Sequence, residues 1–319
     1  MHPASPSQKP ALMLTGPTGI GKTELAVELA GRKPVEIISA DSMQLYRGME
    51  IGTAQPTPQE RQRARFHLCG VLEPDQGCNA RQFLEMCDSA HRRIAERGHW
   101  PVYVGGTGMY LRALRWGLID RGAPDPSLRR RLEQLAAREG TPTLHQRLAR
   151  LDPRAARRID PNDRVRLVRA LELCERTGGP LSALQTQWAR PHPRFPHLLV
   201  VLYAPRSVCH ERIARRTDAM LARGWIEEVD RLLQHHVEPG HHGFKALGYQ
   251  EIARYLEGEL DRHQLRDRIV HRTRQFARRQ VIWFRRERPA IWLSTHSDAT
   301  GCLAERLQKL LEMLEKLYL

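Results

Sequence analysis

The residues with the clearest chemistry lie near the amino terminus, in the stretch Gly16-Pro17-Thr18-Gly19-Ile20-Gly21-Lys22-Thr23. This stretch fits the phosphate-loop pattern G-x-x-x-x-G-K-[ST] without a gap. Glycines let the backbone curl so that successive N–H groups point at one anion, and the positive end of the following helix adds to the attraction. Lys22 supplies a charge for phosphate oxygens, and the Thr23 hydroxyl is a ligand suited to Mg²⁺. The sequence therefore predicts a site for a diphosphate or polyphosphate.

A carboxylate follows the second β-rich run of the chain. Asp41 comes directly after Val35–Ala40 and begins the segment Asp41-Ser42-Met43-Gln44. At this place an aspartate either caps a following helix or faces the bound diphosphate as a base or a substrate anchor. Its position alone favours neither interpretation.

Three expected strands would position these residues. Ala11–Thr15, Val35–Ala40 and Trp100–Val104 are short apolar runs, and helix formers such as Glu24–Ala30 separate them. Strands that alternate with helices predict a parallel α/β sheet. Ligands of such sheets gather at the carboxyl ends of the strands. We therefore expect the phosphate loop, Asp41 and the glycines that follow the third strand to converge on one crevice.

The middle of the chain has a different character. Helical segments are expected at Leu128–Arg138, Thr143–Leu151 and Arg164–Arg176, after which the strand-like run His197–Ala204 rejoins the sheet. The sequence thus predicts a P-loop-type α/β core made of residues 1–114 and 197–319, with a small all-helical insertion at residues 115–196. Further helices are expected at about 206–235, 246–257, 261–287 and 303–317.

The charge of the chain is unevenly distributed. Its 319 residues carry a formal net charge of +15, and 41% are hydrophobic, which excludes global disorder. Residues 1–120 hold 14 basic and 12 acidic residues, residues 121–196 hold 16 and 8, and residues 197–319 hold 21 and 16. The run Arg266–Arg288 contains nine arginines and only two acids. Arginine presents forked donors to phosphate and stacks on bases, so this run predicts contact with nucleic acid, against the alternative of a solvated helix face.

Several classes of protein are not expected. The apolar run Leu198–Tyr203 is far shorter than the roughly 20 residues of a membrane helix, and no signal peptide is expected. The six cysteines form no C-x-x-C pair, which indicates a reduced, cytoplasmic chain without structural zinc. The histidine pairs at 235–236 and 241–242 lack the spacing of a metal site and predict a solvated loop.

Seven motifs together closely resemble those of the bacterial tRNA dimethylallyltransferase (tRNA isopentenyltransferase) family over essentially the full chain. They are Gly16–Thr23, Ser39–Tyr46, Gly52-Thr53-Ala54, Gly105–Tyr110, Asp163–Leu173, Ala246–Tyr249 and Thr273–Gln280. The resemblance implies transfer of a dimethylallyl group from dimethylallyl diphosphate to N6 of the adenosine 3′ of the tRNA anticodon (position 37), with release of diphosphate. The phosphate loop would then hold the prenyl diphosphate rather than ATP. This agrees with the apolar run Val200–Ala204, because Pro205 follows it and not the acidic residue of a second nucleotide-binding motif.

The resemblance also implies roles for the candidate catalytic residues. Asp41 would bond the adenine N6 amine and act as the general base, and Thr23 would bind Mg²⁺. Lys22 would neutralise charge that grows on the leaving diphosphate. Arg216 matches the family's diphosphate-binding arginine, although Arg215 is close in register. The diphosphate-binding set is then Gly16, Pro17, Thr18, Gly19, Ile20, Gly21, Lys22, Thr23 and Arg216.

On the RNA side, the target base must be extruded from the stem-loop before it enters a pocket. In the family the helical insertion helps to clamp the anticodon stem-loop. Ser42, Met43 and Gln44 would receive the base. Candidates for phosphate contacts are Arg164, Arg166, Lys245, Arg274, Arg278 and Arg279. Tyr249, Gln275, Gln280 and Trp283 either meet bases or pack in the core, and Asp41, Thr107 and Gly248 complete the expected tRNA-binding set.

Other functions compete with this interpretation. They are a small-molecule kinase that uses ATP at the phosphate loop, an adenylate isopentenyltransferase that acts on free nucleotides, and an RNA-binding ATPase. The arginine run and the basic insertion favour a macromolecular RNA acceptor. The chain departs from the family pattern at Gln55, where most members are expected to carry lysine. A role that needs a positive charge is therefore not expected at this position. An enzyme that grips one stem-loop can work as a monomer, which is the expected state.

Overall fold

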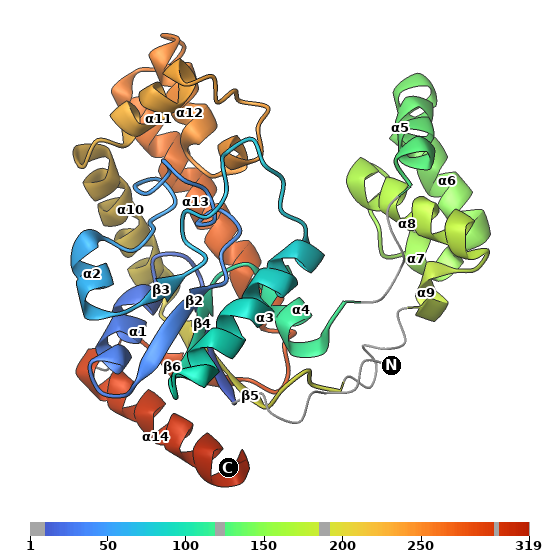
Figure 1. Ribbon diagram of the computed structural model, residues 1–319. Helices are drawn as coiled ribbons and strands as arrows, with labels where there is room; N and C mark the ends of the chain where they lie inside the picture. Colours follow the sequence, from blue (N-terminus) through green and yellow to red (C-terminus); the bar gives the residue numbers. More distant parts are fainter. Residues whose placement is uncertain (1–9, 119–124, 185–191, 297–299, 319) are drawn as a thin grey trace. The chain divides into compact units, whose positions relative to one another are not determined.

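The computed structural model describes residues 10–118, 125–184, 192–296 and 300–318 (Figure 1). The chain divides into two compact units, one of residues 1–115 with 193–319 and one of residues 116–192. The expected boundaries of the insertion were 115 and 196. Within the described residues, no helix has both the length and the apolar character that crossing a membrane requires.

A six-stranded parallel sheet forms the centre of the first unit, with the order β3-β2-β4-β1-β5-β6. All five residues of β1 are buried, as is typical of a parallel strand covered on both faces. The expected parallel α/β fold is confirmed. The edge strands β3 and β6 were not predicted, because they are short and only half-buried and so give no continuous apolar run. The strands are β1 (Ala11–Thr15), β2 (Val35–Ser39), β3 (Phe66–His67), β4 (Trp100–Gly105), β5 (His197–Tyr203) and β6 (Ile291–Ser294).

Nine α-helices accompany the sheet among the described residues of this unit. The segment at 206–235, expected as a helix, is two helices, because Gly224 adopts the left-handed conformation (φ 94°) between them. The helices are α1 (Lys22–Ala30), α2 (Pro58–Arg63), α3 (Ala80–Glu96), α4 (Gly108–Trp116), α10 (Arg206–Ala222), α11 (Trp225–Gln234), α12 (Tyr249–Leu256), α13 (Arg262–Phe284) and α14 (Thr300–Tyr318).

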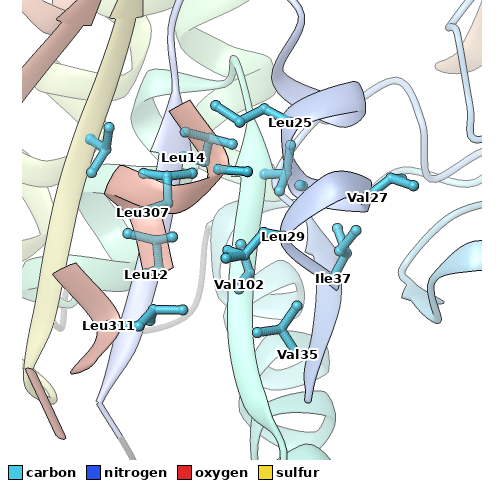
Figure 2. Packing of buried hydrophobic residues seen from close by; sticks show 14 of the residues in the cluster. Leu12, Leu14, Leu25, Val27, Leu29, Val35, Ile37, Val102, Leu307 and Leu311 are labelled. Carbon is cyan, nitrogen blue, oxygen red and sulfur yellow. The ribbon is translucent and has the colours of Figure 1, made fainter. Parts of the chain in front are cut away.

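Helices α1 and α14 cover one face of the sheet. Figure 2 shows Leu12 and Leu14 of β1 packed among Leu25 and Leu29 of α1 and Leu307 of α14. All of these side chains are at most 2% exposed. Burial of each such side chain contributes about 1.5–3 kcal/mol. This packing fixes β1 and α1, and therefore the start and end of the phosphate loop.

Helix α3 covers the opposite face. Tyr103 of β4 points away from the first cluster, and its hydroxyl lies 2.9 Å from Nδ1 of His91 on α3, with both side chains buried. Phe83 of α3 stacks on Tyr110 of α4 with 3.8 Å between ring centroids. Because α4 begins directly after the Gly105–Thr107 loop, this packing sets where that loop lies.

All regular secondary structure in the described residues of the second unit is α-helical, and the unit has its own core. Leu132, Leu144, Leu148, Leu167 and Leu171 are at most 1% exposed and form one cluster. Arginines cover its surface, which accounts for the basic charge of this part of the sequence. Its helices are α5 (Pro126–Glu139), α6 (Thr141–Leu151), α7 (Pro153–Ala156), α8 (Arg164–Thr177) and α9 (Leu181–Leu184).

Candidate active site

A cavity of about 670 Å³ opens at the carboxyl ends of β1, β2 and β4. It brings together the phosphate loop, the segment Asp41–Gln44 and Thr107, which follow these three strands. Arg216 of α10, Lys245 and one face of α13 complete the wall. Residues more than 200 positions apart thus line one space, as the parallel topology requires.

The phosphate loop is curled around its own lysine. Lys22 Nζ donates hydrogen bonds to the carbonyls of Gly16 and Pro17, at 3.1 and 3.0 Å. Gly21 stands before α1 with φ 96°, a conformation that favours glycine. Within the described residues, the N–H groups of residues 19–23 donate to no protein acceptor. A curl of free N–H groups at a helix start is a ready site for an anion.

The charge of Lys22 is tuned by its surroundings. Burial and, to a smaller extent, the nearby Arg216 lower its pKa to about 8, although the carboxylate of Asp41 acts in the opposite direction. The ammonium is therefore poised to lose its proton slightly above neutral pH when no anion is bound. A bound diphosphate would raise the pKa again.

Arg216, and not Arg215, faces the cavity. Its Nη1 donates to the Thr18 hydroxyl at 3.2 Å, and the side chain lines the cavity wall. Burial lowers its pKa, an effect that Asp41 and Glu60 oppose. Arg215 is exposed on the other side of α10 beside Glu211, at 3.7 Å. The geometry thus places at the cavity Arg216, the residue that the resemblance favoured, and not its neighbour Arg215.

Asp41 does not cap a helix. The segment after it forms turns, and α2, the next helix, is capped by Thr57. One Asp41 oxygen accepts the N–H of Met43 at 3.0 Å, which closes a local turn. The side chain is half-buried and lines the cavity. The helix-cap interpretation is wrong, and Asp41 faces the same space as the phosphate loop.

The neighbours of Asp41 are fixed by side chains from other segments. The N–H of Ser42 donates to Thr107 Oγ1 at 3.0 Å. The Gln44 amide accepts from Ser39 Oγ at 2.7 Å and donates to the Ala54 carbonyl at 2.7 Å. Gln44 therefore shapes the cavity wall with its polar atoms already bonded to protein.

Gln55 and Glu228 hold the same wall from behind. Gln55 is 5% exposed and donates to the Tyr46 carbonyl at 2.6 Å, a role that needs no charge. Glu228 is 1% exposed and accepts the N–H of Ile51 at 2.7 Å and that of Gly52 at 2.9 Å. No sequence signal pointed to Glu228, because it lies in α11 outside every recognisable motif.

Two residues of the expected tRNA-binding set are buried, and a third lies off the cavity. Tyr249 has no exposed surface, and its hydroxyl donates to Glu228 at 2.7 Å. It therefore packs in the core, and the prediction that it contacts a base is wrong. Gly248 is buried, and a Cβ there would lie 2.2 Å from the Trp225 ring. Trp283 is half-buried beneath the guanidinium of Arg112, 4.6 Å from its ring centroid, and does not line the cavity.

One face of α13 lines the cavity, at Ile269, Arg272, Thr273, Phe276, Arg279 and Gln280. Steps of three and four residues mark a helix face, so this spacing was the signal by which Arg272 and Thr273 could have been added to the site. Arg274, Gln275 and Arg278 lie off this face. Gln275 and Arg278 are exposed, while Arg274 is half-buried.

The other candidate RNA contacts and the metal ligand are placed as follows. Arg164 and Arg166 are exposed in the first turn of α8 in the second unit, and Lys245 is exposed at the cavity. Thr23 lines the cavity beside Lys22. Across the described part of the chain, no group of three or more His, Cys, Asp or Glu could by itself hold a metal ion. The structure thus offers a hydroxyl ligand inside an anion site.

Comparisons with known proteins agree with this architecture. The family model for IPP transferase matches residues 44–287, and the model for isopentenyl transferase matches residues 10–73. The tRNA dimethylallyltransferase of Anaeromyxobacter dehalogenans (strain 2CP-C) is 44% identical over 298 residues, which are 93% of this chain and 99% of that protein. The tRNA dimethylallyltransferase of Thermotoga maritima is 40% identical over 296 residues, 93% and 96% of the two chains.

Solved structures give the same result. The tRNA isopentenylpyrophosphate transferase of Bacillus halodurans superposes with a TM-score of 0.70 at 32% identity, over 98% of this chain and 99% of that one. A eukaryotic dimethylallyltransferase acting on tRNA superposes with a TM-score of 0.75 at 28% identity, over 86% and 70%. The chain therefore belongs to the IPP transferase family of prenyltransferases, the family of the tRNA dimethylallyltransferases.

Proposed function

We propose that this chain transfers a dimethylallyl group from dimethylallyl diphosphate to N6 of the adenosine at tRNA position 37. The observation that carries the proposal is a single cavity whose wall contains a phosphate loop, a carboxylate and an arginine-bearing helix face. A kinase would need the loop and a base, but not a long arginine helix beside them. A diphosphate donor explains the loop, deprotonation of an amine explains the carboxylate, and a polyanionic acceptor explains the arginines of the helix.

The diphosphate would bind the free N–H groups of the loop together with Lys22 and Arg216. In the transfer step the adenine N6 attacks C1 of the dimethylallyl group. The N6–C1 bond forms, the C1–O bond breaks, and its electron pair leaves with the diphosphate. Asp41 takes the proton that N6 loses. Lys22 and Arg216 stabilise the charge that grows on the diphosphate in this half-enclosed site.

A Mg²⁺ ion fits this donor set. Thr23 presents a hydroxyl at the start of α1, within the cavity, and the remaining ligands would be diphosphate oxygens and water. When bound, the ion would neutralise part of the diphosphate charge. The absence of a carboxylate cluster in the described residues agrees with an ion that arrives with its substrate.

The RNA would meet the chain on two basic surfaces. One consists of Arg274, Gln275, Arg278 and Arg279 on α13 with Lys245, and the other includes Arg164 and Arg166 of the insertion, residues 115–196. Ser42, Met43, Gln44 and Thr107 would form the wall that receives the flipped base. Gripping a single stem-loop requires one copy of the chain, so we propose a cytoplasmic monomer.

The decisive assay compares acceptors. The protein is incubated with Mg²⁺, labelled dimethylallyl diphosphate and either an anticodon stem-loop with adenosine at position 37, the same stem-loop with guanosine there, or free AMP. Label should enter only the adenosine stem-loop, since guanosine lacks the N6 amine. Label in AMP would establish the adenylate isopentenyltransferase alternative. Turnover of ATP without label in RNA would establish a kinase or ATPase.

A further inference from the structure

The side-chain amide of Gln280 joins three parts of the active-site wall. Its Oε1 accepts the N–H of Thr18 in the phosphate loop at 2.8 Å. Its Nε2 donates to the carbonyl of Gly106, in the loop after β4, at 3.0 Å. The side chain is 5% exposed. One residue of α13 thus connects the diphosphate site, the loop after β4 and the arginine helix.

The surrounding backbone makes room for this amide. A Cβ on Gly106 would lie 2.1 Å from Gln280 Nε2, far inside any real contact distance. Only glycine therefore allows the amide to occupy its place. The two bonds leave each side of the amide group with a protein partner inside the wall, and such buried bonds are costly to lose.

Thr18 is held from a second direction. Its hydroxyl accepts the hydrogen bond from Arg216 described above, while its N–H is taken by Gln280. The next five N–H groups of the loop, of residues 19–23, have no recorded protein acceptor in the described structure. The bond to Gln280 thus fixes the point at which the anion-binding curl begins. A site curled before its ligand arrives loses less free energy in ordering when it binds.

We propose that Gln280 is a positioning residue for the phosphate loop and not a contact for RNA. It acts on the diphosphate through Thr18, and this inference rests on the proposed function in that the anion is a diphosphate. Arg279, its neighbour on the same helix, faces the cavity with its guanidinium 5.8 Å from the centroid of the Phe276 ring, and it remains a candidate contact for RNA. The proposal predicts that the amide matters for affinity toward diphosphate and not for affinity toward RNA.

The test uses two matched variants of one helix in the full-length protein. Gln280→Met keeps the side-chain volume but removes both hydrogen bonds. Gln275→Met makes the same change at an exposed residue that lies off the cavity. Calorimetry measures the binding of inorganic pyrophosphate in the presence of Mg²⁺. Filter binding measures the affinity for the anticodon stem-loop at one fixed salt concentration.

Gln280→Met should weaken pyrophosphate binding roughly tenfold, the worth of one to two hydrogen bonds, and change RNA affinity by less than about twofold. Gln275→Met should leave pyrophosphate binding unchanged and weaken RNA binding. Gln280→Asn, which is too short to reach both partners, should follow Gln280→Met and replaces it if the methionine variant does not fold.

Three results would overturn the inference. Loss of RNA affinity with intact pyrophosphate binding would return Gln280 to the RNA surface, and unchanged affinity for both would show that the bonds are idle. An equal loss of both affinities would show a general structural role. Failure of the unaltered protein to bind pyrophosphate would contradict the proposed function instead, so the two failures are distinguishable.

Discussion

At the scale of single residues, the site sets two cations beside one carboxylate. Lys22 and Arg216 both lie close enough to Asp41 for its charge to act on their pKa values. The charge of Asp41 thus acts on both cations before any substrate binds. The same three groups divide the proposed chemistry, since the cations serve the leaving group and Asp41 serves the nucleophile.

The role of Asp41 can be isolated by Asp41→Asn. We expect prenyl transfer to fall by about 10²–10⁴-fold, the usual contribution of a general base, while affinity for the stem-loop stays within a fewfold of the unaltered protein. Single-turnover transfer and filter binding measure the two quantities. Asp75→Asn, at an exposed loop position, is the control. A near-normal rate, or a variant that no longer folds, would contradict the assignment.

Lys22 predicts a pH dependence with a definite sign. The protonated ammonium attracts the diphosphate, so affinity for dimethylallyl diphosphate should be constant well below pH 8 and fall as pH rises through about 8. The Lys22→Arg variant keeps its positive charge throughout this range, and any ionisation of the ligand affects both proteins equally. Calorimetry from pH 6.5 to pH 9 should therefore show the fall only for the lysine form. Parallel profiles would rule out Lys22 as its source.

At the scale of elements, α11 and α12 act as a rigid backing for the loop at residues 51–57. Glu228 of α11 and Tyr249 of α12 meet behind the loop, and the carboxylate receives two backbone N–H groups and one hydroxyl. Burial raises the pKa of Glu228. Elements that carry none of the proposed catalytic residues therefore determine the shape of the site.

Removal of this carboxylate should destabilise the protein. Glu228→Ala leaves the half-buried N–H groups of Ile51 and Gly52 without their acceptor, and each costs about 1–3 kcal/mol. We expect the free energy of unfolding in urea to fall on the order of 3 kcal/mol or more. Glu227→Ala, at the exposed neighbouring position in the same turn of α11, should change it by less than about 0.5 kcal/mol. Equal effects of the two changes would show that Glu228 does not anchor the loop.

At the scale of the whole molecule, the proposed active site and an ion pair that stabilises the sheet lie at opposite ends of the strands. The cavity and the arginine face of α13 lie at the carboxyl ends of the strands. At the amino end of β2, Glu36 is 2% exposed and receives a bidentate hydrogen bond from Arg97, at 2.8 and 2.7 Å. This ion pair stabilises the sheet at the end away from the chemistry.

Glu36 predicts loss of stability in acid. Burial opposes ionisation, but the hydrogen bonds from Arg97 and His67 outweigh it and lower the pKa of Glu36 to about 2 from 4.5. A lowered carboxyl pKa stabilises the fold above pH 4.5, and this contribution is lost as pH falls toward about 2. Melting temperatures between pH 7 and pH 2.5 should drop less steeply for Glu36→Gln, which has no such proton to bind. An equally steep drop would place the acid sensitivity elsewhere.

The distribution of arginine predicts a steep salt response. If the six candidate residues neutralise phosphates, stem-loop affinity should fall between about 300-fold and 2,000-fold from roughly 50 to 200 mM salt. Arg278→Ala should make the slope of log affinity against log salt concentration shallower by about one, since one phosphate contact is lost. Filter binding across this range checks both values. A flat response would exclude α13 and the insertion as the RNA surface.

Much of this molecule follows from local pattern. The phosphate loop, the strands β1, β2, β4 and β5 and the α/β class could be predicted because glycine spacing, apolar runs and helix periodicity are properties of adjacent residues. The short edge strand β6 could not, since four half-buried residues carry no such pattern. The expected function rested on the combination of seven family motifs, since no single motif identifies the family.

Which side chains face the substrate depended on packing between distant segments. Arg215 and Arg216 differ by about 100° around one helix, so only the docking of α10 decides which of them meets the cavity. Gln280 and Thr18 are 262 positions apart, and Tyr249 is enclosed by groups from two other elements. A hydrogen bond between such residues costs chain entropy that only the assembled core offsets, so no local pattern encodes it. The residue types thus define the chemistry, and the assembled sheet and helices define which residues perform it.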